Sequence, residues 1–276
     1  MDLNSVTAIE RPRQRKELPL WRSGDAWLAG GTWLFSEPQP LVDRLIDIVD
    51  FGWPALEITD QSLRISATCK IAQLDGATFP PGWTAAPLFN QCCRSFLASF
   101  KVWNMATVGG NLCMALPAGP MISLTAALDG ICTVWTPDGN ERRVTVTDFV
   151  LAPQRTALAQ GELLRSIELP LPALHHRTAF RQIALSPLGR SAALLIGALS
   201  PVDGSFTLTI TAATPRPVRM QFSRLPPPAP LQEKLGDEIP RDEYYDDIHG
   251  APAWRRHMTL QFAEEIRAEL AEEGPG

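Results

Sequence analysis

Two pairs of adjacent glycines stand in segments that could bind a phosphate. The first pair lies in residues 29–32 (AGGT), after an apolar stretch that includes Trp27 and Leu28, and the second lies in residues 106–111 (ATVGGN). Adjacent glycines let the backbone turn with exposed N–H groups and with no Cβ in the way. Two such loops could bind both halves of a pyrophosphate. Each pair taken alone is more typical of an ordinary turn.

Several other chemistries lack the residues that they need. Neither glycine loop fits the G-x-G-x-x-G or the G-x-x-x-x-G-K-[ST] pattern, so the Rossmann and P-loop interpretations have no motif. The four histidines have no spaced carboxylate or serine partner that would make a general base or a nucleophile. No zinc site or iron–sulfur cluster is predicted, because the cysteines show neither C-x-x-C spacing nor nearby histidine pairs. The cysteines are Cys69, Cys92, Cys93, Cys113 and Cys132.

Charge is distributed unevenly along the chain. The 276 residues carry a net charge of −5, and residues 231–276 hold twelve Asp and Glu against five Lys and Arg. This acidic C-terminal part argues against a nucleic-acid partner. The first twenty residues carry charges where a signal peptide needs an apolar core, and no apolar run approaches the length of a membrane span. We therefore expect a cytoplasmic protein without a membrane span, whose thiols stay reduced.

The elements that must position the glycine loops form separate runs of strands and helices. A tight turn in residues 136–140 predicts a hairpin of residues 131–135 and 144–146. Apolar residues at four-residue steps predict helices over residues 88–100 and from Trp254 onward, and another helix is expected at 121–128. Residues 192–199 fit either a helix or a strand, and the proline-rich residues 225–230 fit a loop. Strands are expected at residues 45–49, 56–58, 63–67, 163–169 and 207–212. Without regular alternation, these elements favour an α+β fold.

Five stretches match a known family in their order and spacing. They are residues 27–34 (WLAGGTWL), 104–112 (NMATVGGNL), 161–170 (GELLRSIELP), 179–182 (AFRQ) and 249–257 (HGAPAWRRH). From residue 20 to residue 270 the chain resembles the FAD-binding medium subunit of the xanthine dehydrogenase and carbon monoxide dehydrogenase family, the molybdenum hydroxylases. The resemblance implies a two-part FAD-binding domain of the vanillyl-alcohol-oxidase/PCMH type over residues 1–170. It also implies a smaller C-terminal flavoprotein domain of sheet and helices over residues 171–276.

The resemblance implies where FAD would bind. The two glycine loops would hold its pyrophosphate, mostly through backbone N–H groups. Leu164 would lie near the adenine or the ring system, or would serve the core alone. Arg181 would lie near the flavin and raise its reduction potential, or would form a surface salt bridge. The implied contacts of the loops are Ala29, Gly30, Gly31, Thr32, Trp33 and Leu34, and Thr107, Val108, Gly109, Gly110 and Asn111.

Three residues depart from the family pattern. Trp103 replaces an arginine, Pro120 stands where an aspartate often contacts the cofactor, and Trp33 replaces a small or acidic residue. These departures put side-chain contacts in question more than the backbone cradle. They leave open a scaffold subunit that binds FAD weakly or not at all. A stand-alone flavin oxidase is a further alternative, although the chain leaves little room for a substrate domain.

The resemblance also implies partners and a role. A large molybdopterin-binding subunit would oxidise the substrate, and a small [2Fe-2S] subunit would pass electrons to FAD in this chain. The assembly would be a heterotrimer or a dimer of heterotrimers. Trp103, Trp135 and Trp254 are candidates for docking, with burial in the core as the alternative. The sequence names neither the substrate nor the final acceptor, which could be NAD, oxygen, a quinone or another protein.

Overall fold

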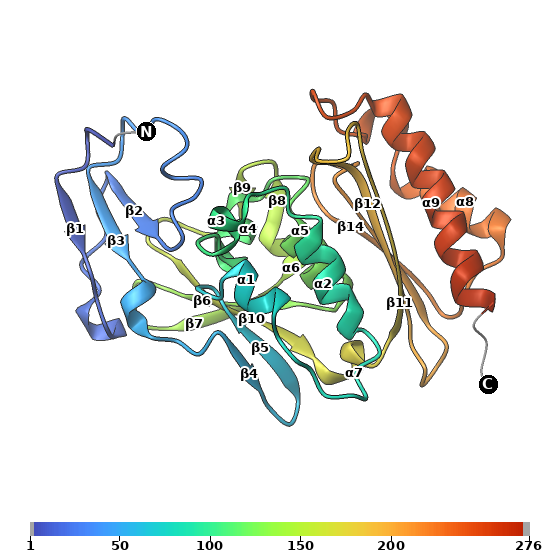
Figure 1. Ribbon diagram of the computed structural model, residues 1–276, viewed down its shortest axis with the longest axis horizontal. Coiled ribbons are helices and arrows are strands. Elements are labelled where there is room, and N and C mark those ends of the chain that lie inside the picture. The colour runs from blue at the N-terminus through green and yellow to red at the C-terminus, as the bar shows by residue number, and fades with distance from the viewer. Residues whose placement is uncertain (1–2, 273–276) are drawn as a thin grey trace.

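The structure, a computed structural model, describes residues 3–272 and has an α+β fold, as the sequence predicts. Three β-sheets stand side by side along its long axis (Figure 1). The first has the strand order β1-β3-β2, with β1 at Ala8–Glu10, β2 at Asp25–Leu28 and β3 at Arg44–Asp47. Both pairings in this sheet are parallel. The ends of the two expected domains, residues 1–2 and 273–276, lie outside the described residues.

The second sheet has five strands in the order β4-β5-β10-β6-β7. The strands β4 (Leu56–Ile58), β5 (Ser62–Ser66) and β10 (Leu163–Pro170) were expected at these places, and so was β6 (Ile131–Trp135) as the first strand of a hairpin. The second strand of the hairpin, β7 (Glu141–Thr145), starts three residues before the predicted residues 144–146. All four pairings are antiparallel. Two further strands, β8 (Val150–Ala152) and β9 (Arg155–Thr156), lie between β7 and β10 in the chain and form a short antiparallel sheet of their own.

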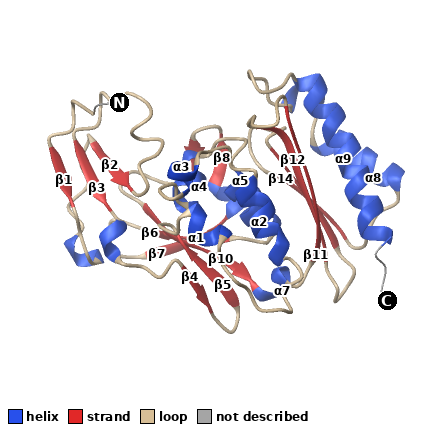
Figure 2. Cartoon of the chain, viewed as in Figure 1, coloured by secondary structure: helices blue, strands red, loops and turns tan. Residues whose placement is uncertain are grey.

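Short helices cover the second sheet and form the first hydrophobic core with it (Figure 2). The predicted helix over residues 88–100 is only partly right. It ends as α2 at Arg94, where the amide and the hydroxyl of Ser95 both donate to the carbonyl of Gln91. Phe100, expected on the buried face, is 73% exposed at the start of α3. The helices are α1 (Ile71–Asp75), α2 (Ala86–Arg94), α3 (Phe100–Trp103), α4 (Val108–Met114), α5 (Pro120–Ala127), α6 (Val146–Phe149) and α7 (Leu171–Leu174).

The third sheet has four antiparallel strands in the order β11-β12-β13-β14. They are β11 (Arg177–Ala184), β12 (Ser191–Leu199), β13 (Phe206–Thr211) and β14 (Val218–Phe222). The segment that fitted either helix or strand is β12. Its Leu194 and Ile196 belong to the first core, whereas Ala193 and Leu195 belong to a second core on the opposite face. A strand covered on both faces shows no alternation of polar and apolar residues, which explains the ambiguity.

Two helices, α8 (Pro228–Glu238) and α9 (Pro252–Glu272), cover the outer face of the third sheet (Figure 1). The loop predicted over residues 225–230 is wrong at its end, because Pro228 starts α8. Proline suits the first helical position, where its missing N–H would have no partner. The predicted C-terminal helix is confirmed, and its Phe262 and Ile266 lie in the second core. Each such buried side chain contributes about 2 kcal/mol relative to exposure.

Among residues 3–272, no helix combines the length and the apolar character that a bilayer crossing needs.

Candidate functional site

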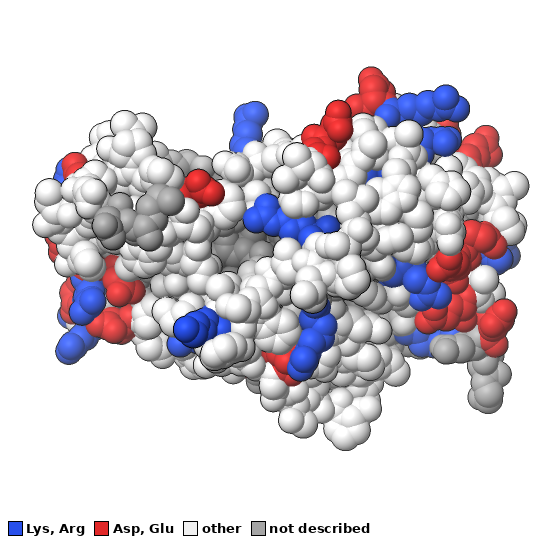
Figure 3. All heavy atoms as spheres, turned by 45° about the horizontal axis from the view of Figure 1, so that its top comes forward, with Lys and Arg blue, Asp and Glu red and all other residues white. Residues whose placement is uncertain are grey.

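A cavity of about 910 Å³ is lined by residues from all three sheets and from the segments that join them. This volume lies within the range of ligand sites. Figure 3 shows one face of the molecule hollowed near its middle, with Lys and Arg side chains beside the hollow. Most of the predicted site residues line the cavity, namely Ala29, Gly30, Gly31, Thr32, Trp33, Leu34, Thr107, Gly109, Gly110, Asn111 and Leu164.

The first glycine loop, residues 29–34, offers free backbone donors to the cavity. Within residues 3–272, the N–H groups of residues 30–34 donate no hydrogen bond, and the Thr32 hydroxyl has no partner. Gly30 lets the loop pack on the second glycine segment, since a Cβ there would stand 2.0 Å from the carbonyl oxygen of Met105. Gly31 has a φ of +68°, a conformation that glycine adopts without strain. Unpartnered amides beside a cavity suit an anion such as a phosphate.

The second glycine loop differs from its expected role, because the N–H groups of residues 108–111 already have partners. The amide of Val108 donates to the carbonyl of Cys69 at 2.8 Å, and that of Gly109 donates to the carbonyl of Ala67 at 3.0 Å. The amide of Gly110 donates to the Thr107 hydroxyl at 3.0 Å, which caps α4. The expectation that both loops present free main-chain amides is therefore wrong for residues 108–111 of the second loop.

What the second loop offers the cavity is room and one side-chain amide. A Cβ on Gly110 would meet no atom outside its own helix and chain neighbours except the Thr107 hydroxyl, at 3.0 Å, so the glycine keeps space open. The Asn111 side-chain oxygen accepts from the amide of Met121 at 3.1 Å. The Asn111 amide nitrogen has no acceptor within the described residues and is left for a ligand.

Two predicted site residues do not line the cavity. Val108 is buried in the first core, because it starts α4 with its side chain turned inward. Arg181 donates to Glu265 of α9 at 2.8 Å and lies 2.7 Å from Glu269. The salt-bridge alternative is therefore the one found for Arg181, and the carboxylates raise the pKa of its guanidinium against the effect of burial. Leu164, in contrast, lines the cavity and also lies in the first core.

The cavity is also lined by residues that no sequence pattern singled out. Arg190 comes from the loop between β11 and β12, and its exposed guanidinium has no ion-pair or hydrogen-bond partner within residues 3–272. His249, which precedes α9, is half-buried and also lines the cavity. Burial raises the pKa of the Cys113 thiol to about 12, so this cavity-lining side chain stays protonated at neutral pH.

A buried arginine shapes the C-terminal side of the cavity. Arg255, at the start of α9, is 1% exposed. Its guanidinium donates to the carbonyls of Gly250 and Ala192 at 2.8 Å each, to the carbonyl of Ala212, and to the carboxylate of Asp247. These bonds fix the segment 245–250 against the third sheet, so the wall formed by this segment is held in place.

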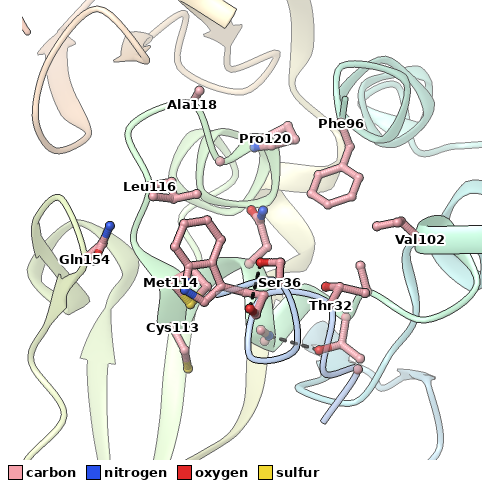
Figure 4. Close-up of a pocket in the computed structure, with 18 of the residues that line it drawn as sticks. Thr32, Ser36, Phe96, Val102, Cys113, Met114, Leu116, Ala118, Pro120 and Gln154 are labelled. Carbon is pink, nitrogen blue, oxygen red and sulfur yellow. Dashed lines mark hydrogen bonds between the residues drawn. The ribbon is translucent and has the colours of Figure 1, made fainter. Parts of the chain in front are cut away.

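The residues that depart from the family pattern lie in different places. Trp33 and Pro120 line the cavity, whereas Trp103 is half-buried outside it, with its indole N–H donating to the carbonyl of Phe96 at 3.2 Å. Trp135 and Trp254, the other docking candidates, are also half-buried. In Figure 4, Phe96 and Val102 lie on the opposite side of the cavity from Leu116 and Gln154. With Pro120, the side chains of Phe96, Val102 and Leu116 make this part of the cavity lining apolar.

Comparison with known proteins identifies this arrangement. The sequence profile of the family described as "FAD binding domain in molybdopterin dehydrogenase" matches residues 18–172. The chain belongs to this family. Its cofactor is therefore FAD, and the family is one of oxidoreductase flavoprotein subunits, as the sequence resemblance implies.

Relatives and solved structures agree with this assignment. The xanthine dehydrogenase FAD-binding subunit of Escherichia coli O157:H7 is 26% identical over 83% of this chain and 80% of its own length. Caffeine dehydrogenase subunit beta of Pseudomonas sp. (strain CBB1) is 32% identical, but this chain spans only 33% of that relative. A chain of reconstituted CO dehydrogenase from Oligotropha carboxidovorans has a TM-score of 0.81 at 21% identity, covering 97% of this chain and 99% of that one, which shows a shared fold.

Proposed function

We propose that the cavity holds FAD and that the chain passes electrons through it from a partner subunit to an external acceptor. The observation that carries this proposal is the free backbone of residues 30–34, five unpartnered N–H groups beside a cavity within the volume range of ligand sites. Membership of a family of FAD-binding domains supports the same cofactor. When bound, the flavin supplies the conversion between single electrons and electron pairs.

We assign each residue of the cavity a different contact with FAD. The amides of residues 30–34 and the Thr32 hydroxyl would donate to the pyrophosphate, because they have no acceptor within residues 3–272 and hydrogen bonds to an anion are stronger than neutral ones. The Asn111 side-chain nitrogen would add a donor from the opposite loop. Gly110 would leave space for the phosphates, and Arg190 would supply positive charge near an anionic group of the ligand. Leu164 would lie against an apolar part of the cofactor.

The proposed partners are a large molybdopterin-binding subunit and a small [2Fe-2S] subunit. Relatives that carry the names of dehydrogenase subunits and medium chains support this assembly. Within residues 3–272, no cluster of His, Cys, Asp and Glu could hold a metal ion. We also retain the proposed domain boundary between residues 170 and 171, where β10 ends and α7 begins.

The test replaces Gly110 by valine and measures the FAD content of the purified protein from its absorbance. We expect Gly110→Val to lose most of its FAD while keeping its far-UV circular dichroism spectrum, because the added side chain enters the cavity. The matched control is Gly236→Val in α8, where a Cβ would meet no atom within 4 Å. Normal FAD content in Gly110→Val would refute the assignment of this loop. A wild-type chain that binds no added FAD would favour the scaffold alternative.

A further inference from the structure

Trp33 is the residue of the free-amide loop with a large aromatic side chain in the cavity wall. Its indole is half-buried and lines the cavity. The amide and the hydroxyl of Ser36 both donate to the carbonyl of Trp33 at 2.8 Å. The amide of Phe35 donates to the carbonyl of Gly31 at 2.9 Å, so the turn on either side of Trp33 is fixed. The indole is therefore held at the cavity by a backbone that is already ordered.

The indole N–H of Trp33 also lacks a partner. Trp27 donates its indole N–H to the carbonyl of Glu162 at 2.9 Å, and Trp103 and Trp135 likewise have acceptors. No acceptor for Trp33 exists among residues 3–272, and its nitrogen is not among the fully buried unpaired atoms. The indole edge thus remains accessible, and tryptophan N–H groups in partly buried sites usually find a partner.

We propose that the Trp33 indole stacks on an aromatic ring of the bound dinucleotide, and this inference rests on the proposed function. The indole extends from the loop whose amides would hold the pyrophosphate, and both ends of the dinucleotide carry a flat ring. A flat ring in an apolar wall gains from stacking on another flat ring. The large residue that departs from the family pattern would then add to binding rather than block it.

The test measures the affinity of apoprotein for FAD by calorimetry, for wild type, Trp33→Leu and Trp33→Phe. Leucine keeps the apolar character but not the ring, so we expect affinity about tenfold weaker, the equivalent of about 1.4 kcal/mol. Phenylalanine keeps a ring and should lose less than leucine does. The matched control is Trp135→Leu, which removes a half-buried indole outside the cavity and should bind FAD as wild type does.

Binding of FMN and ADP identifies the ring. If Trp33→Leu weakens FMN but not ADP, and the fluorescence of bound flavin rises, the indole stacks on the isoalloxazine. If it weakens ADP but not FMN, the indole stacks on the adenine. Equal FAD affinity in Trp33→Leu and wild type, or weaker FAD binding with both fragments unaffected, overturns the inference while the proposed function stands. A wild-type chain that does not bind FAD overturns both.

Discussion

Replacing Arg255 by methionine is the perturbation whose effect follows most directly from the structure. Methionine fills a similar volume but removes every donor of the guanidinium. The carbonyls of Gly250, Ala192 and Ala212 and the carboxylate of Asp247 then lose their shared partner. Arg255 is 1% exposed, so water does not readily replace it at the three carbonyls.

The magnitude depends on how buried each orphaned group is. Breaking a buried ion pair by removing one partner costs about 3–5 kcal/mol. The Asp247 side chain is 29% exposed and is therefore partly solvated once Arg255 is lost, which puts Arg255→Met near the lower end, about 3 kcal/mol. Asp247→Asn keeps a polar acceptor and all three carbonyl bonds, so it should cost only about 1 kcal/mol.

Urea unfolding followed by circular dichroism measures both variants against wild type, with slopes compared to check that the transitions are alike. The expected order of stability is wild type, Asp247→Asn, Arg255→Met. FAD affinity should fall in Arg255→Met, because the segment 245–250 lines the cavity. If Arg255→Met is as stable as wild type, or if Asp247→Asn is the less stable variant, the hydrogen bonds of the buried guanidinium do not hold the segment 245–250 in place.

Three other predictions concern the loops, the charges and the pH response. Gly30→Ala should destabilise the fold by about 2 kcal/mol or more in thermal unfolding, because its Cβ would stand 2.0 Å from the Met105 carbonyl oxygen; an unchanged melting temperature would contradict the close packing. Arg190→Gln should weaken FAD binding several-fold in titrations, whereas Arg181→Gln should not. The reverse result would favour the expectation from the sequence that Arg181 lies near the flavin. Glu162→Gln should lower the free energy of unfolding at neutral pH, because the hydrogen bond from Arg142 lowers the pKa of Glu162 in the folded protein. The stability that comes with this lowered pKa is lost as the pH falls. Urea unfolding should therefore give a smaller difference in free energy of unfolding between Glu162→Gln and wild type below roughly pH 4. A difference that does not change with pH would contradict this role of Glu162.

Strands with one covered face were predictable from the sequence, and elements set by distant contacts were not. Alternation at Leu63 and Ile65 indicated β5, and both side chains are fully buried. The two-faced burial of β12 erased the corresponding signal. The helix expected to reach Phe100 ends at Arg94, beside the hydrogen bond from the Ser95 hydroxyl to the carbonyl of Gln91, and the four-residue apolar step does not encode this end.

The candidate site was predictable as far as glycine spacing and family resemblance reach. Both glycine loops do line one cavity. The sequence could not show that the amides of Val108 and Gly109 are taken by carbonyls of residues 67 and 69, since only the folded chain brings these segments together. It could not rank Arg181 against Arg190 either, because the acidic partners of Arg181 lie 84 and 88 positions further along the chain, on α9.

The cavity wall combines residues that lie far apart along the chain, and this has a thermodynamic consequence. Residues 29–34 belong to the N-terminal half of the chain and residues 245–255 to its C-terminal half, so a ligand in the cavity would touch both. Occupancy would couple the melting of the two halves into a single transition, and the stabilisation would grow with the logarithm of ligand concentration. The empty chain, without this fastening, would be the form in which one half can open while the other stays folded.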